Sequence, residues 1–468
     1  MKKARNLIYE KRFFLASFGL YLLAFLVSHY FYYQRLAAFG CFDDCFNYMG
    51  GYFISKGKEI YVDFFFNHSF LMPFISFLIQ KITAPQTIYS LILYHKLFLF
   101  AFSLGMGTLL ILRFRYTALL ALVFFELTKF YVFGDHFLGE SFVVYPLMYL
   151  VGLVWEKVNK RKLFSYDYLL VGLFVWFCVF TREPYAPLSL ILFLLILVGK
   201  GEWKQKTYGL IILGGLSVLS VFSISIKDFF LNVYIYNKDI IGDEFKRNNV
   251  YGLGLLNTLI YPVRVIIQGE WNLLRQILII FSSVFIATGI FYSVKFKRLG
   301  FLVLLFILGL ANIRPTIPGQ AFYEAYHMNV WYALMLFATL LITFELIKKE
   351  KTLRVYFLMP FFILFVYILF SPGFFIHEKI NKTQELNTGY GNEFAYGTAI
   401  KTLSSPKSNL FLENTDDLIY WVANVDSSYK YTWYTAHMPL IERYKNERSK
   451  MFENNPPDFY YDACKLLR

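Results

Sequence analysis

Two adjacent acidic residues, Asp43 and Asp44, directly follow the first strongly apolar stretch of the chain. Just beyond the membrane exit of a helix, a carboxylate stays hydrated and charged close to the bilayer surface. Two neighbouring carboxylates cannot both ionise cheaply unless a cation lies between them or water solvates them. The pair could therefore hold a divalent metal, or one acid could act as a general base near a departing phosphate. Taken alone, the pair is better explained as a cap for a short helix starting at Cys45.

Cysteines flank the same acids, with Cys41 and Cys45 at helical i, i+4 spacing. Two thiols at this spacing could contribute to a metal site, but alone they are a weak signal. The chain has four cysteines, and Cys178 and Cys464 lie far from the other two, so a disulfide framework is not expected. We therefore expect Cys41 and Cys45 to be unpaired and to behave as small hydrophobic residues.

Other ionisable residues lie at the ends of apolar stretches, where they could reach a membrane-embedded substrate. Glu140 is a functional candidate because acids at membrane depth are rare, although an ordinary helix-end acid explains it about equally well. Arg182 could bind a phosphate with two parallel hydrogen bonds, or it could simply pair with its neighbour Glu183. Arg314 and His327 bracket a later loop and could form the other side of a phosphate site.

The composition is that of a membrane protein with many spans. The chain has 468 residues, of which 57% are hydrophobic, 21% aromatic and 17% charged, and its mean hydropathy is +0.47. A soluble domain does not tolerate this balance. The net charge of +14 comes from short basic clusters between apolar runs, as the positive-inside rule describes for cytoplasmic loops. Nucleic-acid binding is therefore disfavoured.

Apolar runs predict about eleven transmembrane helices in a multi-pass protein of the cell membrane, with a retained N-terminal anchor and a cytoplasmic N-terminus. Residues 43–56 and 69–82, in the first outer loop, each predict a short amphipathic helix at the membrane interface. The predicted spans are 13–33, 87–112, 116–133, 138–155, 166–180, one beginning after Pro184, 208–226, 271–294, 299–313, 326–347 and 355–370.

The last fifth of the chain has the composition of a soluble domain. We expect residues 1–371 to form the membrane domain and residues 372–468 to form a small extracytoplasmic α/β domain. Within the second region, residues 409–412 predict a strand and residues 416–425 predict a helix.

The run DDCFNYMGGYFISKGKEIYVDFFFNH resembles the first outer loop of GT-C glycosyltransferases. It is most similar to the bacterial relatives of protein O-mannosyltransferases and to lipid A aminoarabinose transferases. A later element, GQAFYEAYHMNVWY, also resembles these families. Two departures are Asp44, where glutamate is commoner, and the residues after His68, which are Ser69 and Phe70 in place of two prolines. The residues that match are Asp43, Asp44, Tyr48, Gly57, Lys58, Tyr61, Asp63, Phe65 and His68.

The resemblance implies a GT-C membrane fold with interfacial helices, and a hexosyl- or pentosyltransferase activity. Such an enzyme moves a sugar, with inversion, from a polyprenyl-phosphate donor to a protein, lipid or glycan acceptor outside the cytoplasm. Asp43 would then be the base or a metal neighbour. Asp44, Asp63 and His68 would supply a second carboxylate, a ligand of a divalent metal or a sugar contact, and Tyr48 would bind substrate. For His68, capping of the segment at Ser69 is nearly as good an explanation.

Two other functions remain open from the sequence. A transporter or flippase of lipid-linked sugars also needs arginine and acids around a cavity, but it predicts charges at mid-membrane on broken helices. This chain concentrates its ionisable residues at the outer ends of the spans. A surface-polymer ligase predicts a large catalytic loop late in the chain and a dispensable early acid pair.

Overall fold

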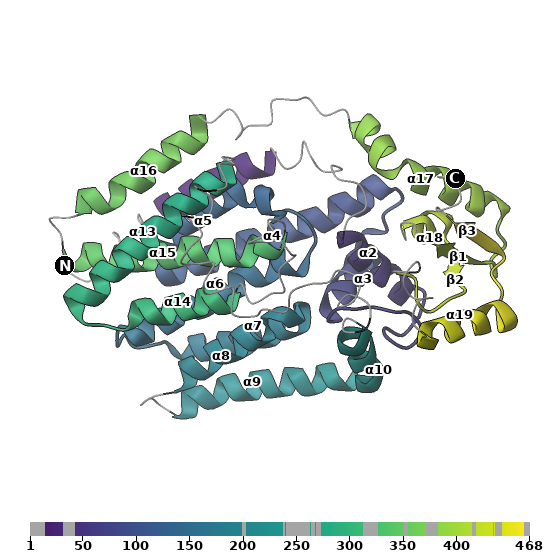
Figure 1. Cartoon of the computed structure of the whole chain (residues 1–468), viewed down its shortest axis with the longest axis horizontal. Coiled ribbons are helices and arrows are strands. Elements are labelled where there is room, and N and C mark those ends of the chain that lie inside the picture. Colours follow the sequence, from purple (N-terminus) through teal and green to yellow (C-terminus); the bar gives the residue numbers. More distant parts are fainter. Residues whose placement is uncertain are drawn as a thin grey trace.

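The computed structural model describes residues 15–30, 43–198, 203–236, 239, 263, 267, 273–311, 326–350, 354–370, 382–413, 418–433, 435 and 442–462. Within these residues the chain is mostly helical, with one small parallel sheet near the C-terminus. Figure 1 shows a bundle of helices along the long axis of the molecule, with α2, α3 and the sheet gathered at one end. A helical bundle followed by a small α/β region confirms the coarse prediction from the sequence.

Antiparallel neighbours joined by short connections form much of the bundle, as at Arg115, which alone joins α4 to α5. Its helices are Leu15–Tyr30, α4 (Ile88–Phe114), α5 (Tyr116–Thr128), α6 (Gly139–Val158), α7 (Ser165–Thr181), α8 (Ala186–Leu197), α9 (Trp203–Phe222), α13 (Leu273–Phe296), α14 (Gly300–Ala311), α15 (Asn329–Lys349) and α16 (Arg354–Phe370). Shorter helical turns are η1 (Lys129–Val132), η2 (Glu183–Tyr185), α10 (Ile226–Phe230), η3 (Leu231–Ile235) and η5 (Tyr326–Met328).

Five of the described helices are long and apolar enough to cross a membrane, which makes the chain a helical membrane protein. They are Ile88–Phe114, Gly139–Val158, Trp203–Phe222, Leu274–Phe296 and Tyr326–Lys349. The remaining spans of the predicted eleven stay predictions. The third predicted span, 116–133, is not one continuous helix, because α5 ends at Thr128 and the 3-10 turn η1 follows it. With 13 residues, α5 is shorter than the roughly 20 that a full crossing needs.

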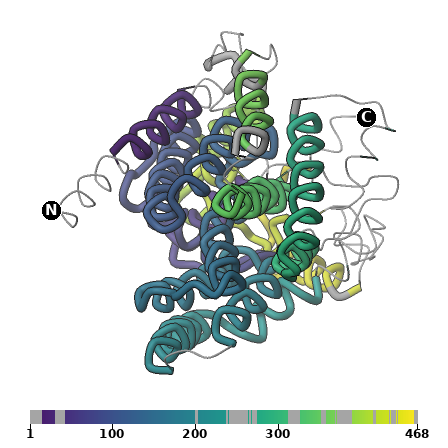
Figure 2. The backbone as a smooth tube through the Cα atoms, turned by 90° about the vertical axis from the view of Figure 1, so that its left-hand side faces the viewer, coloured from purple at the N-terminus to yellow at the C-terminus, as the bar shows by residue number. Residues whose placement is uncertain are grey.

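Burial separates the central helices of the bundle from those at its surface. In the view along the bundle, α15 lies near the middle, and 94% of its apolar window is buried (Figure 2). Only 17% of the window of α9 is buried, and Ile211 and Leu219 on this helix are exposed. A helix that is apolar on all sides belongs in a protein core or against lipid. We infer that α15 is the core helix and that α9 presents side chains to lipid.

The first predicted loop contains two helices, α2 (Asp44–Ser55) and α3 (Leu71–Thr83), which agree closely with the predicted segments 43–56 and 69–82. They pack against each other through small residues. A Cβ added to Gly51 would lie 2.7 Å from the backbone nitrogen of Phe77, so the two backbones can approach this closely only because residue 51 is glycine. We call the end of the bundle with α2 and α3 the loop end. The opposite end, with Arg113, Lys157 and Lys348, is the basic end.

The C-terminal region packs on α2 and α3. It comprises α17 (Lys382–Leu403), β1 (Asn409–Glu413), α18 (Leu418–Ala423), β2 (Asp426–Ser427), α19 (Glu442–Asn454) and β3 (Phe459–Asp462), with parallel strands in the order β2-β1-β3. The predicted strand at 409–412 and helix at 416–425 are confirmed by β1 and α18. The Tyr52 hydroxyl donates to the carbonyl of Val425 at 3.2 Å, and Trp421 donates to Gln80 at 3.3 Å. These contacts hold α2 and α3 between the bundle and the sheet.

Replacing Gly51 with alanine should destabilise the protein, because the added Cβ meets backbone atoms of α3 that cannot rotate away. We expect Gly51→Ala to cost about 1–3 kcal/mol, the usual range for overpacking, and to lower the thermal unfolding midpoint in detergent. Gly105→Ala on α4 is the matched control, since nothing lies within 4 Å of a Cβ there. That control should be neutral or slightly stabilising. Equal midpoints for the two variants would contradict the close packing of α2 on α3.

Candidate functional site

A narrow polar crevice opens at the loop end, between α2, the start of α3, the start of α6 and the end of α7. It encloses about 20 Å³, enough for roughly one water molecule. Four residues predicted from the sequence line it together: Asp43, His68, Glu140 and Arg182. The other described lining residues are Asn47, Met72, Leu138, Gly139 and Thr181.

Asp43 occupies the position just before α2, yet its side chain makes no capping hydrogen bond there. The capping explanation is therefore wrong for this residue. Its Oδ2 instead accepts a hydrogen bond from the hydroxyl of Tyr326, which lies 283 positions later in the chain. Tyr326 begins η5, directly before α15, so the core helix of the bundle orients the carboxylate that faces the crevice.

Arg182 and Glu140 form a buried ion pair across the crevice, with 2.8 Å between Nε of the arginine and Oε1 of the acid. Glu140 lies in the first turn of α6, where the unpaired N–H groups of a helix favour negative charge. Arg182 is the residue after α7, and a Cβ on Gly139 would lie 3.1 Å from its Cβ and Cδ. Glycine at position 139 therefore leaves room for the arginine stem.

The guanidinium of Arg182 has further donor capacity. Among the described residues, Arg182 donates one hydrogen bond, from Nε, and its nearest other acid oxygen is Glu183 Oε1, 4.0 Å from Nη1. A separation of 4.0 Å is an ion pair but not a hydrogen bond. The two Nη groups are thus the donors that could take the oxygens of a phosphate or carboxylate ligand.

His68 pairs with Glu183, a residue that the sequence suggested only as a partner of Arg182. The Nδ1 of His68 lies 2.8 Å from Oε1 of Glu183, and the backbone N–H of Ser69 donates to Oε2 at 3.3 Å. Burial would raise the pKa of Glu183, but the charge and hydrogen bond of His68, together with the charge of Arg182, lower it to about 2. An ionised Glu183 therefore holds the His68 ring at the crevice, and His68 is not the cap of the following helix.

Asp44 and its partner Tyr48 point away from the crevice. The Oδ2 of Asp44 accepts from the Tyr48 hydroxyl at 3.2 Å and lies 3.3 Å from Nδ1 of His136. Beside them, Lys96 donates to Asp135 at 3.3 Å. Burial raises the pKa of Asp44, but the hydrogen bond and charge of His136 and the charge of Lys96 outweigh it and leave that pKa lowered. The structure thus places the two adjacent acids in different surroundings, with Asp44 in an anchoring network.

The remaining predicted residues lie outside the crevice or outside the described chain. Asp63 is exposed, and its carboxylate accepts from the backbone N–H of Glu59 at 2.7 Å, which closes a turn. His327 lies in η5, with its ring centroid 4.1 Å from that of Tyr326, so it flanks the residue that contacts Asp43. Arg314 lies outside the described residues.

Sequence reasoning missed Tyr326 and the role of Glu183. Tyr326 immediately precedes the predicted His327 in the element GQAFYEAYHMNVWY, so the element was identified but the residue within it was not. Glu183 follows the predicted Arg182 directly. In both cases the pattern marked the neighbouring residue, and the structure joins Tyr326 to Asp43 and Glu183 to His68 by contacts across the fold.

The candidate divalent metal at Asp43 and Asp44 stays a prediction. The carboxylates of the two residues do not share one set of surroundings, and the described chain contains no group of three or more histidine, cysteine, aspartate or glutamate residues placed to hold a metal. Cys45 is disulfide-bonded, so the expectation that it is unpaired was wrong.

Comparison of the chain with protein-family models and with curated proteins finds no match. The fold and the crevice together define a helical membrane protein in which Asp43, His68, Glu140 and Arg182 meet at the loop end of the bundle.

The ion pair of Glu183 and His68 should make stability depend on pH. Because the folded pKa of Glu183 is about 2 against an ordinary value of 4.5, its contribution is present above pH 4.5 and is lost as the pH falls toward 2. At about 1.4 kcal/mol per pKa unit, the loss reaches at most about 3 kcal/mol. We expect Glu183→Gln to lower the unfolding midpoint clearly at pH 7 and much less at pH 3.

The exposed acid Glu59 supplies the control for this measurement. Glu59→Gln should leave the midpoint close to that of the unchanged protein at both pH values. A difference between Glu183→Gln and the unchanged protein that is the same at pH 7 and pH 3 would show that the carboxylate charge is not responsible.

Proposed function

We propose that this protein is a GT-C-type membrane glycosyltransferase that uses a polyprenyl-phosphate sugar as donor and works at the outer face of the membrane. The observation that supports it most is the convergence of Asp43 and Arg182 on one crevice at the end of the bundle. The phosphate of a membrane-anchored lipid lies at the bilayer surface, which is where the ends of spanning helices also lie. A carboxylate and a guanidinium at that level fit a base and a phosphate ligand.

The reaction assigns one task to each of these groups. An acceptor hydroxyl attacks the anomeric carbon of the sugar and its proton passes to the Asp43 carboxylate, while the bond from that carbon to the phosphate oxygen breaks. The polyprenyl phosphate leaves with the electron pair, and the Nη donors of Arg182 stabilise the charge that develops on its oxygens. Tyr326 and Glu140 are positioning residues for Asp43 and Arg182 respectively.

The charge of the crevice and its small volume show that a polyprenyl-phosphate sugar needs more than the crevice now offers. Of the described lining residues, Arg182 is the permanent cation, whereas Asp43 and Glu140 are acids. We infer that additional positive charge comes from Arg314 or from a divalent cation, because the donor is itself an anion. A sugar also requires the crevice to widen, since its present volume is about 20 Å³.

The orientation follows from the distribution of basic residues. Arg113, Lys157, Arg161 and Lys348 lie at the end of the bundle opposite the crevice, and the positive-inside rule assigns such an end to the cytoplasm. The crevice and the C-terminal α/β region would then be extracytoplasmic. The disulfide at Cys45 supports this orientation, because disulfides persist in oxidising compartments.

Substitutions at Asp43 and Arg182 should separate chemistry from binding. Short-chain polyprenyl phosphate is common to every candidate donor, so its binding can be measured before the sugar is known. We expect Asp43→Asn to bind this lipid normally. With a panel of polyprenyl-phosphate hexoses and pentoses as donors, the rate at which it cleaves the sugar from the polyprenyl phosphate should fall about 100-fold or more. Arg182→Lys keeps the positive charge but loses the two parallel N–H donors of the guanidinium. It should therefore weaken polyprenyl phosphate binding about tenfold.

Asp63→Asn is the matched control, because Asp63 is an exposed acid of the same loop that does not line the crevice. Full turnover by Asp43→Asn would remove the base assignment. If the unchanged protein moves a lipid-linked sugar across vesicles without cleaving any donor in the panel, the protein is a transporter and the proposed function is wrong.

A further inference from the structure

Thr181 carries a buried hydroxyl at the wall of the crevice that the described fold does not use. It is the last residue of α7, it lines the crevice beside Arg182, and it is 1% exposed. Among the described residues, its Oγ1 has no hydrogen-bond partner. A buried hydroxyl without a partner costs free energy, because it has lost its hydrogen bonds to water and gained none in return. A partner from outside the chain would remove that cost.

Threonines elsewhere in the bundle satisfy this need within their own helices. Their hydroxyls donate to the carbonyl four positions earlier at 2.6 to 2.8 Å, as in Thr108, Thr128, Thr339 and Thr343. The end of a helix offers such carbonyls in excess, because its last four have no partner within the helix. The hydroxyl of Thr181 makes no such bond, so its own helix does not account for it.

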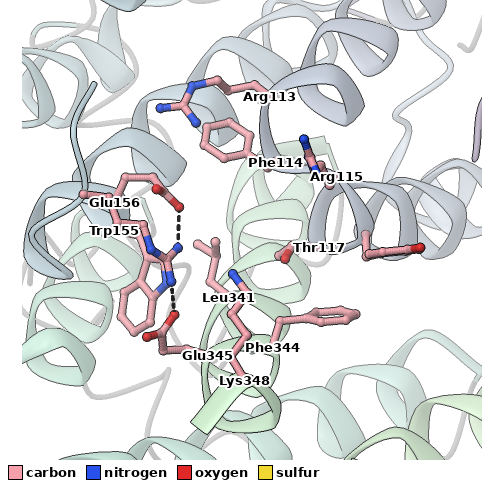
Figure 3. Close-up of a pocket in the computed structure, with 12 residues that line it drawn as sticks. Arg113, Phe114, Arg115, Thr117, Trp155, Glu156, Leu341, Phe344, Glu345 and Lys348 are labelled. Carbon is pink, nitrogen blue, oxygen red and sulfur yellow. Dashed lines mark hydrogen bonds and ion pairs between the residues drawn. The ribbon is translucent and has the colours of Figure 1, made fainter. Parts of the chain in front are cut away.

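A larger polar cavity at the basic end shows the opposite arrangement. It encloses about 570 Å³ between the ends of α4, α6 and α15. Both acids of its described lining, Glu156 and Glu345, contact Arg161, and dashed lines in Figure 3 mark these contacts. None of the described side chains that line this cavity has a buried polar atom without a partner. The unpartnered hydroxyl is therefore particular to the crevice.

The groups beside Thr181 favour a ligand that accepts several hydrogen bonds. Arg182 follows it directly and has its two Nη groups available as donors. A Cβ added to Gly139 would lie 3.1 Å from the carbonyl oxygen of Thr181 and from two carbons of the Arg182 side chain, so the start of α6 packs on both residues. A hydroxyl adds one donor without adding charge, and a phosphate accepts from several donors at once.

We propose that the hydroxyl of Thr181 donates to the phosphate of the lipid-linked donor, next to the Nη groups of Arg182. The inference rests on the proposed function, because it takes polyprenyl phosphate as the ligand. The hydroxyl oxygen is buried in the closed crevice, and the widening that a sugar requires gives the phosphate access to it. Thr181 then binds and orients the phosphate, and it takes no part in the proton transfer to Asp43.

Calorimetric titration of the purified full-length protein with short-chain polyprenyl phosphate tests this contact. Thr181→Val keeps the shape of the side chain and removes the hydroxyl. We expect it to weaken binding about tenfold or more, because a hydrogen bond to a charged group is lost. Thr181→Ser keeps a hydroxyl and should retain most of the affinity. The polyprenol of the same length has no phosphate, and its affinity should be equal in all three proteins.

The unfolding midpoint without lipid separates a binding role from a structural one. Thr181→Val should unfold at the same temperature as the unchanged protein or slightly above it, because the hydroxyl that it removes has no partner among the described residues. A midpoint that falls together with the affinity would show a structural role and overturn the proposal. A loss of the same size for polyprenol would overturn the phosphate as the partner of the hydroxyl.

Thr343→Val is the matched control, since Thr343 is also fully buried but donates within α15 and does not line the crevice. It should bind polyprenyl phosphate like the unchanged protein. Unchanged affinity in Thr181→Val, or equal weakening in the serine and valine variants, would overturn the Thr181 contact and leave the proposed function intact. If the unchanged protein itself fails to bind polyprenyl phosphate, the proposed function is wrong, and the contact falls with it.

Discussion

The loop end of this protein depends on the ion pair of Arg182 and Glu140. Both side chains are almost fully buried, and a buried guanidinium without a partner carboxylate would destabilise the fold by about 3–5 kcal/mol. The pair joins the start of α6 to the end of α7, and Gly139 leaves the space that the arginine stem occupies. Glu140 accepts a hydrogen bond only from Nε of Arg182. The same interaction therefore fixes the arginine and leaves its two Nη groups available as donors at the crevice.

Helix geometry separates the two acids that looked like one functional unit. Successive residues of an α-helix point about 100° apart, so adjacent side chains at a helix start face different neighbours. Asp44 turns inward to Tyr48 and His136, next to the pair of Lys96 and Asp135, and this network ties α2 to α4 and to the turn before α6. With α2 held in this way, Asp43 is directed to the crevice.

Local patterns in the sequence predicted the elements better than the contacts between them. The helices α2 and α3 and the strand β1 follow from local hydrophobic patterning, and Glu140 and Arg182 stood out as ionisable residues that border apolar runs close to membrane depth. The contact of Asp43 with Tyr326 joins residues 283 positions apart, and no local pattern specifies it. The break after Thr128 was also missed, because the mostly apolar run 116–133 does not reveal that Glu126 and Lys129 form a buried ion pair 2.6 Å apart at the end of α5.

In this bundle, a ligand-binding site differs from a structural ion pair in that some of its hydrogen-bond donors have no acceptor among the described residues. Asp167 illustrates the structural kind, because it accepts from Arg113 twice, from Tyr149 and from the backbone of Phe164, and it is fully buried. Arg182 differs, since its partner Glu140 takes only the hydrogen bond from Nε. A membrane protein must place most of its ionisable groups at the ends of its spans, where water and headgroups solvate them. Charge at those ends is therefore expected in any such fold, and it indicates a ligand only where the protein leaves part of it unsatisfied.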